Sequence, residues 1–383
     1  MATILGPIRA TQRFVTAFSF TSSSMSATSI RTMSTANAHA EQPVYRPLVF
    51  RTKAEVRAWR NEQTRSGKSV GFVPTMGALH DGHVSLVQSS LRMNDRTIVS
   101  IFVNPSQFAP SEDLASYPRT FEADLDLLSR LYCDIGPLKE AARTGDALTM
   151  SKATAALSGA SGASPDVSSE NVTQVDAVFV PTVDEMYPSG IPLERNQQTG
   201  AFVSVEGLSS VLEGAVRPQF FRGVATVVTK LLNIVNPTRV YFGQKDVQQT
   251  VVIKRMVSDL CYDIAVIIVP TKRAQSGLAL SSRNAYLSEQ TQADAVAIYK
   301  GLAAAEQIFR KDTRVSTIVS AIESSITTKF PKEDIEYITV SDPITLEEIK
   351  DKILPLRGAI VSLAVRVPNN FGKKTRLIDN IIL

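Results

Sequence analysis

The 383-residue chain is 44% hydrophobic, as globular proteins are, and is long enough to bury a large core in roughly two domains. Its net charge of +4 is dispersed and no apolar run could cross a bilayer, so neither a nucleic-acid partner nor a membrane span is expected. The two cysteines, Cys133 in an insertion and Cys261 in a core stretch, have no metal or redox spacing. We expect both to be reduced, as in an intracellular protein.

Residues 1–40 differ in composition from the rest of the chain. They are rich in Ser and Thr, carry Arg9, Arg13 and Arg31, and contain no acidic residue before Glu41. This composition is typical of a mitochondrial transit peptide, but also of a disordered N-terminus without a targeting role. Both interpretations stay open, so the expected location is cytoplasmic or mitochondrial, and the segment is left out of the predicted fold.

From residue 41 to residue 284, apolar strand patterns alternate with helical ones. Strands are expected at 69–74, 96–103, 175–180, 239–242 and 264–269, and helices at 53–65, 83–91 and 121–131. A further helix is indicated by the stripe Val224, Val227, Leu231 and Val235. This alternation predicts an α/β fold with a Rossmann-like, doubly wound parallel sheet and helices on both of its faces.

Two parts of the chain depart from this alternation. Residues 132–174 are largely Ala, Ser, Gly and Thr, and we interpret them as a mobile surface insertion, with a small lid over the site as the alternative. Residues 285–383 have helical patterns at 293–310 and 315–330, followed by strand patterns at 335–340 and 359–367. They predict a smaller C-terminal α+β lid domain, in which the basic run at 373–376 is a loop or a solvated face.

The most informative segment is Val-Pro-Thr-Met-Gly-Ala-Leu-His-Asp-Gly-His, residues 73–83. A strand is expected to stop at Pro74, and a helix to begin near His83 or Val84 after a glycine-containing turn. Such a turn directs backbone N–H groups and the positive end of a helix towards a ligand, which favours phosphate. His80 and His83 can donate hydrogen bonds to phosphate oxygens where charge develops.

Two further segments follow expected strands, at the edge where open α/β sheets bind ligands. Asn104-Pro105-Ser106-Gln107 carries an amide that can orient a polar substrate, although it can also be a plain turn. In the segment 242–249, Lys245 offers a charge for phosphate, Asp246 is expected to cap or orient, and Gln249 falls one helical turn after Lys245. The alternative for this segment is a surface helix start with a capping Asp.

Two loops complete the set of candidates. The loop 277–284 places Ser281 and Ser282 beside Arg283, a group that suits an anionic ligand but is also common in ordinary loops. The segment 117–120 is interpreted as a helix entry, with Arg119 reaching a neighbouring loop.

Taken in this order, the segments closely resemble the pantoate–β-alanine ligase family, whose members belong to the nucleotidyltransferase superfamily of adenylate-forming enzymes. Residues 74–83 resemble the family's HxGH signature, Ser282-Arg283 lies in a counterpart of the KMSKS loop, and residues 376–380 resemble the family's C-terminal ending. The resemblance implies ATP-dependent condensation of pantoate with β-alanine through a pantoyl adenylate, with release of pyrophosphate and AMP. It also implies a homodimer with contacts near residues 104–120, and Mg²⁺ bound mainly to ATP phosphates rather than to a protein metal site.

The resemblance also implies residue roles. The catalytic residues would be His83, as the proton donor, together with His80, Lys245 and Arg283. Gln107 and Gln249 would hold pantoate, and Gln107 also β-alanine. The ATP-binding residues would be Met76, Gly77, Ala78, Leu79, His80, Asp81, Gly82, His83, Gly243, Gln244, Lys245, Asp246, Lys272, Leu280, Ser281, Ser282 and Arg283. Departures from the family pattern occur at Phe220, Gln244, Val247, Lys272, Ala274 and Ser276.

Two other functions are compatible with parts of this pattern. A simple nucleotidyltransferase acting on another small phosphorylated or carboxylic substrate would share the histidine turn, but should lack Gln107 and Gln249 as an acid-binding pair. A degenerate nucleotide-binding or regulatory protein would have lost catalytic groups, whereas this chain keeps His80, His83, Lys245 and Arg283.

Overall fold

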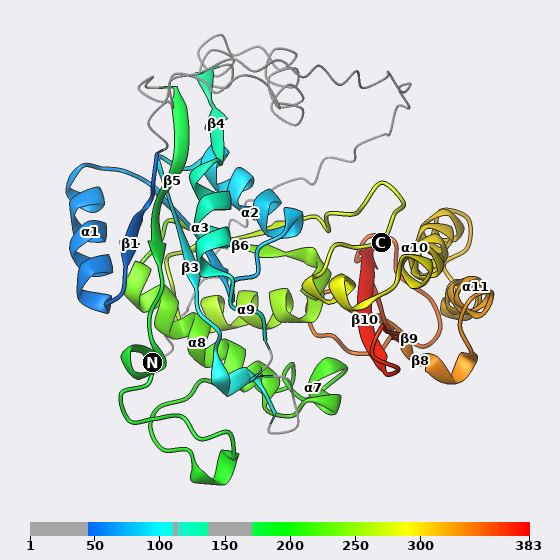
Figure 1. The fold of residues 1–383 in the computed structure, drawn as a ribbon. Coiled ribbons are helices and arrows are strands. Elements are labelled where there is room, and N and C mark those ends of the chain that lie inside the picture. Colours follow the sequence, from blue (N-terminus) through cyan, green and yellow to red (C-terminus); the bar gives the residue numbers. More distant parts are fainter. Residues whose placement is uncertain (1–44, 110–113, 116, 137–170) are drawn as a thin grey trace, which may run out of the picture. The chain divides into compact units, whose positions relative to one another are not determined.

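The computed structural model describes residues 45–109, 114–115, 117–136 and 171–383. The larger sheet of this part of the chain has seven strands (Figure 1). They are β1 (Leu48–Phe50), β2 (Val70–Thr75), β3 (Arg96–Ile101), β4 (Tyr132–Asp134), β5 (Val172–Phe179), β6 (Arg239–Gly243) and β7 (Ala265–Val269).

The strand order of this sheet is β1-β5-β3-β2-β6-β7, and each neighbouring pair is parallel. The short β4 lies outside this order and pairs antiparallel with β5. Starting from β2, the chain first adds strands on one side and then, from β6, on the other. The order therefore reverses between β2 and β6, and the carboxyl ends of strands at such a switch point form the crevice where α/β proteins bind ligands.

Both faces of the sheet are buried, as the strand patterns predicted. Consecutive residues of a strand point to opposite faces, and Phe72 and Val73 of β2 accordingly belong to two different hydrophobic clusters. The same alternation holds for Ile98 and Val99 of β3. Burial on both faces explains the nearly continuous apolar sequence of these strands.

The helices that cover the two faces are amphipathic. Residues of α1 (Lys53–Arg65), α8 (Phe220–Val235) and α9 (Val247–Asp259) join the cluster of Phe72, and residues of α2 (Asp81–Met93) and α3 (Phe121–Ser129) join that of Val73. The expected stripe of α8 is confirmed, because its four members are all buried. Of the helices described, none is long and apolar enough to cross a membrane.

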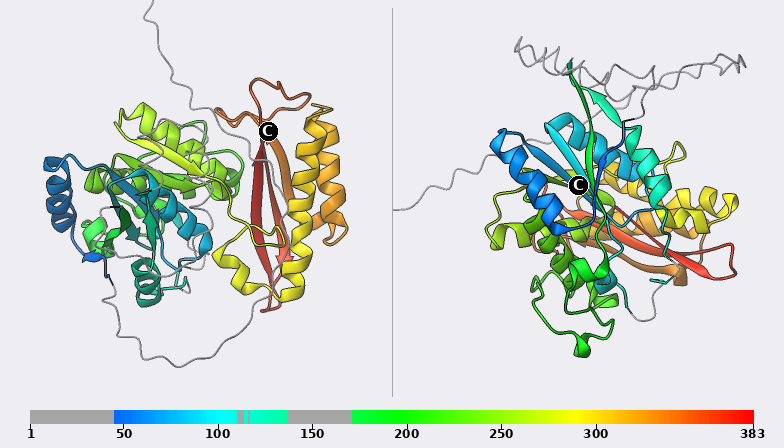
Figure 2. Two further views of the ribbon diagram at one scale, coloured as in Figure 1. Left: turned by 90° about the horizontal axis from the view of Figure 1, so that it is seen from above. Right: turned by 60° about the vertical axis from the view of Figure 1, so that its left-hand side comes forward.

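The C-terminal domain is a three-stranded antiparallel sheet of order β10-β9-β8 with helices on one face. Its elements are α10 (Glu289–Phe309), α11 (Val315–Thr327), β8 (Ile335–Ser341), β9 (Ile360–Pro368) and β10 (Lys374–Ile382). In Figure 2, α10 and α11 lie on the side of this sheet that faces away from the larger sheet. The small α+β domain is therefore confirmed, while its predicted limits at residues 284 and 285 stay a prediction.

Three expectations were wrong in detail. The basic run at 373–376 is not simply a loop or a solvated face, because β10 begins at Lys374 and the Arg376 side chain is largely buried in an ion pair. The predicted insertion has ordered ends, since β4 and the first residues of β5 pair with each other; its middle lies outside the described residues. The cysteines are both free, but Cys133 is buried and Cys261 is exposed, the reverse of their expected settings.

Candidate active site

Loops at the carboxyl ends of β2, β3, β6 and β7 surround one cavity of about 450 Å³. Each loop brings at least one of the residues expected to do chemistry, such as His83 after β2, Gln107 after β3, Lys245 after β6 and Lys272 after β7. These residues are far apart in the sequence. The parallel sheet brings them together because all of its parallel strands end at the same edge.

The histidine turn between β2 and α2 is held by a buried carboxylate on α3. Gly77 has a φ of 83° and Ala78 a φ of 50°, so the backbone here takes a left-handed path that glycine adopts most easily. Asp124, 3% exposed, accepts the N–H of Ala78 at 2.9 Å and that of Leu79 at 2.8 Å. These two amides are thus bonded to Asp124, and were wrongly expected to point towards a ligand.

The two histidines lie at the start of α2, which begins at Asp81, two residues earlier than expected. His80 is the N-cap, and its Nδ1 accepts the N–H of Gly82 at 3.1 Å, while Nδ1 of His83 accepts the N–H of His80 at 3.4 Å. The two rings are 4.2 Å apart. Because each Nδ1 is an acceptor, each neutral ring carries its proton on Nε2, where it can be donated to a ligand.

Both imidazoles are neutral at pH 7. Burial lowers the pKa of His83 to about 3, with smaller contributions from His80 and Lys245. Burial also lowers the pKa of His80, with a further contribution from Lys245. Desolvation disfavours the charged form, and a neighbouring cation acts in the same direction. The pair therefore provides two neutral hydrogen-bond donors rather than two cations.

This burial of His83 predicts that acid destabilises the protein. The pKa of His83 is about 3 in the folded state, against an ordinary value of 6.5, so between these pH values the unfolded chain binds an additional proton. Stability then falls as pH falls through this window, by up to about 2 kcal/mol from pH 6.5 to 5. Urea unfolding at both pH values should show a larger loss for the natural protein than for His83→Gln; equal losses would contradict this origin.

The amide of Gln107 is oriented by buried neighbours. Asn104, 1% exposed, donates from Nδ2 to Oε1 of Gln107 at 3.0 Å, and Arg217 donates to the backbone carbonyl of Gln107 at 3.3 Å. Helix α8 packs closely on this turn at Gly223, where an added Cβ would lie 2.2 Å from the carbonyl oxygen of Ser106. A side chain at position 223 would therefore displace the turn that carries Gln107.

Lys245 and Gln249 both line the cavity, as their spacing of one helical turn predicted. Lys245 lies in a short 3-10 turn, Gln244–Asp246, between β6 and α9, and its side chain is 19% exposed. Its Nζ is 4.0 Å from Oδ1 of Asp246. Asp246 is the N-cap residue of α9 but makes no side-chain capping bond, so the expectation of a capping Asp was wrong.

The loop after β7 folds back on itself before it reaches the serines. Leu280 donates its N–H to the carbonyl of Lys272 at 3.0 Å, and an isolated β-bridge joins Arg273 to Ala279. The Ser281 side chain then accepts the N–H of Arg283 at 3.3 Å. Because Arg283 is exposed, its guanidinium can move towards an anionic ligand.

Most of the expected site residues line the cavity. Those that do so are Met76, His80, Gly82, His83, Gln107, Gly243, Lys245, Asp246, Gln249, Lys272, Leu280, Ser281, Ser282 and Arg283. The lining does not include Gly77, Ala78, Leu79, Asp81 and Gln244. The contacts that any of these residues make with ATP stay predictions.

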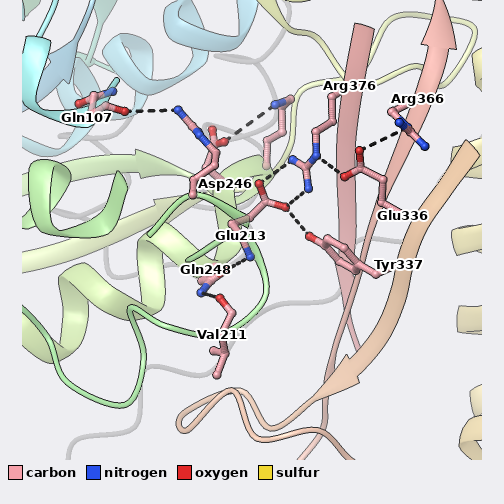
Figure 3. Close-up of polar contacts among 11 residues, drawn as sticks. Gln107, Val211, Glu213, Asp246, Gln248, Glu336, Tyr337, Arg366 and Arg376 are labelled. Atoms are coloured by element: carbon pink, nitrogen blue, oxygen red, sulfur yellow. Dashed lines mark hydrogen bonds and ion pairs between the residues drawn. The ribbon is translucent and has the colours of Figure 1, made fainter. Parts of the chain in front are cut away.

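Sequence reasoning missed a second group of cavity residues, which link the C-terminal domain to the larger sheet (Figure 3). Arg376 of β10 makes two hydrogen bonds of 2.6 Å to the carboxylate of Glu213, which also accepts the hydroxyl of Tyr337 at 2.7 Å. Gln248 holds the same loop by accepting the N–H of Glu213 and donating to the carbonyl of Val211. These partners are far apart in sequence, so no local pattern signals them.

The whole described fold matches known proteins of one kind. The family described as pantoate-beta-alanine ligase matches residues 48–382. The pantothenate synthetase of Herpetosiphon aurantiacus is 41% identical over 335 residues, which cover 88% of this chain and 99% of that protein. The pantoate–beta-alanine ligase of Saccharomyces cerevisiae is 40% identical over 349 residues, with 88% and 99% covered.

Solved structures agree with this result. A pantoate-beta-alanine ligase (pantothenate synthetase) structure from Thermus thermophilus has a TM-score of 0.66 and 38% identity, covering 87% of this chain and 98% of the other. The ligase of Francisella tularensis, solved with beta-gamma ATP and beta-alanine, has a TM-score of 0.55 and 28% identity, covering 88% and 97%. The chain therefore belongs to the pantoate–β-alanine ligase family.

Proposed function

We propose that this protein condenses pantoate with β-alanine at the expense of ATP. One observation carries the proposal: in a member of this family, a neutral histidine pair, Lys245 and the amides of Gln107 and Gln249 line a single cavity. The first set suits phosphate and the second a small hydroxy acid. Placing both substrates in one cavity converts an encounter of two molecules into a reaction within one complex.

In the first step, a carboxylate oxygen of pantoate attacks the α-phosphorus of ATP. The bond from the α-phosphorus to the bridging oxygen breaks, and pyrophosphate leaves. His80 and His83 donate hydrogen bonds from Nε2 to phosphate oxygens, with His83 as the proton donor, and Lys245 and Arg283 balance the charge that develops. Gln107 and Gln249 hold the pantoate in line with the α-phosphorus.

In the second step, the amine of β-alanine attacks the acyl carbon of pantoyl adenylate. The bond between the acyl carbon and the phosphate oxygen breaks, AMP leaves, and the amine loses a proton as the amide forms. The adenylate is needed because a free carboxylate has a poor leaving group. In this proposal the remaining expected ATP-binding residues surround the nucleotide, including Ser281 and Ser282 on its phosphates.

Mg²⁺ is proposed to arrive with ATP. In the described part of the chain, no group of three or more His, Cys, Asp or Glu could hold a metal ion. Two carboxylates that line the cavity are already bonded, Glu213 to Arg376 and Asp379 to Arg273. This donor set suits an ion that stays on phosphate oxygens, and Mg²⁺ keeps its waters readily. The homodimer, its contacts near residues 104–120, the lid action of the C-terminal domain and a mitochondrial signal stay predictions.

The function is tested by AMP release from purified protein given ATP, Mg²⁺ and pantoate, with and without β-alanine. We expect steady AMP formation only when both acids are present, and pyrophosphate–ATP exchange that depends on pantoate alone. Exchange that requires a different substrate would favour the nucleotidyltransferase. Binding of ATP without exchange or AMP release would favour a protein that has lost its activity.

A further inference from the structure

Strand β10 belongs to the C-terminal domain, yet three of its side chains bind segments of the larger domain. Arg376 bonds to Glu213, Asp379 to Arg273, and Asn380 to the turn that contains Lys245. Arg376 and Asn380 lie on the same face of the strand, two pairs of residues apart, so the strand directs both towards the cavity. The Asn380 contact is the one that reaches the proposed phosphate-binding machinery.

The amide of Asn380 is buried, 1% exposed, and all of its polar atoms have partners. Nδ2 donates to the backbone carbonyl of Gln244 at 3.0 Å and to that of Lys245 at 2.9 Å. The same amide accepts at Oδ1 from the side chain of Gln244 at 3.3 Å. Asn380 therefore bonds two successive peptide groups, one of them the peptide group of Lys245 itself.

The turn that Asn380 binds has little support of its own. It is a single 3-10 turn of three residues with no side-chain cap, and Asp246 does not cap the helix that follows. At its start, the space around Gly243 is open, because a Cβ added there would meet no atom within 4 Å. The direction in which this turn presents the Lys245 side chain consequently depends on the two bonds from Asn380.

The strand that presents Asn380 is anchored on both sides of it. The Arg376 pair with Glu213 is strengthened by Tyr337 and by Glu336, which accepts from Nε of Arg376 at 2.6 Å (Figure 3). Arg273 makes two bonds, of 2.6 and 2.9 Å, to Asp379, whose side chain is 5% exposed. Buried two-point pairs of this kind fix geometry as well as adding energy.

We propose that Asn380 is a positioning residue that holds Lys245 in its catalytic place, so that the C-terminal domain completes the phosphate site without itself touching the phosphates through this residue. The inference rests on the function proposed above and extends it to a residue with no expected contact with ATP. It predicts that Asn380 acts on the reaction only through Lys245.

The test is a cycle of four proteins: the natural chain, Asn380→Leu, Lys245→Ala and the double variant. Leucine matches asparagine in shape but cannot donate. We expect Asn380→Leu to lower the single-turnover rate of pantoyl adenylate formation by about 10- to 100-fold, with little change in the KM for pantoate. In the Lys245→Ala background, the same substitution should change the rate less than about twofold, because contacting residues that act as one unit are not additive.

Asn370→Ala, an exposed asparagine in the same domain, is the matched control and should keep the natural rate. Asn380→Ala replaces Asn380→Leu if the leucine variant fails to fold. A rate loss below threefold for the Asn380 variant, or an equal loss in both Lys245 backgrounds, would overturn the inference. A natural rate in Lys245→Ala would instead remove the proposed role of Lys245.

A second measurement separates positioning from the reaction. Amide hydrogen exchange of residues 243–249 should become at least tenfold faster in the Asn380 variant, while exchange in β2 and β3 stays unchanged. This readout decides the positioning claim even if pantoate proves not to be the substrate. Unchanged exchange at 243–249 would overturn it.

Discussion

Lys245→Ala is expected to lower the rate of pantoyl adenylate formation by about 10²- to 10³-fold, the usual loss when one preorganised group that stabilises developing charge is removed. Lys245 is expected to matter most as charge moves onto the pyrophosphate, so the loss should appear mainly in kcat. Its ammonium lies beside the histidine pair, close enough to lower the pKa of both imidazoles. Rapid-quench measurement of a single turnover reports this step directly.

Lys254→Ala provides the control for Lys245. Lys254 lies on α9, which directly follows the turn of Lys245, but it is exposed and does not line the cavity. Both variants should unfold at the temperature of the natural protein, because neither removes buried apolar surface. A single-turnover rate within threefold of the natural value for Lys245→Ala would contradict its assignment to the phosphates.

His83→Ala is expected to raise the activation barrier of the same step by about 2.7–4 kcal/mol, the cost typical of losing one preorganised donor. The reason is specific to this ring. Its Nδ1 is bound to the backbone of the turn, and its Nε2 proton is the one available to a phosphate oxygen. His83→Gln keeps an N–H donor of similar reach and should recover part of the rate.

The pH dependence of the rate adds an independent check. The pKa of His83 is about 3, so this ring stays neutral between pH 5 and 7 and should impose no change of kcat in that range. Ser89→Ala, on the same helix but outside the cavity, should behave as the natural protein. A fall in kcat near pH 6 that disappears in His83→Gln would show that His83 titrates and would contradict this account.

The larger sheet could be predicted because its strands carry their own evidence. Each is a run of β-branched and aromatic residues buried on both faces, so local sequence and final environment agree. Helix α1 was predicted with its correct limits, 53 and 65, and a capping box between Thr52 and Glu55 sets its start. The start of α2 was misplaced by two residues, because His80 takes the N-cap role usually filled by Ser, Thr, Asp or Asn.

The residues that support the site could not be predicted in the same way. Asp124 holds the histidine turn across 46 residues of sequence, and Arg376 pairs with Glu213 across 163. Neither pairing leaves a periodic or local pattern. The charged run before Arg376 suggested solvent exposure, whereas the fold turns this one guanidinium inward against a carboxylate. Chemistry at strand ends is visible in a sequence, and the second set of contacts that orients it is not.

The bond between Asn380 and the carbonyl of Lys245 spans 135 residues, and this has a consequence for how the site forms during translation. At the usual elongation rate of about 5–20 residues per second, the turn of Lys245 leaves the ribosome roughly 7–27 seconds before its partner. The parallel strands β2, β3, β5, β6 and β7 can pair in that interval, but the phosphate site stays incomplete. A nascent chain can thus hold a folded nucleotide crevice long before it is able to activate a substrate.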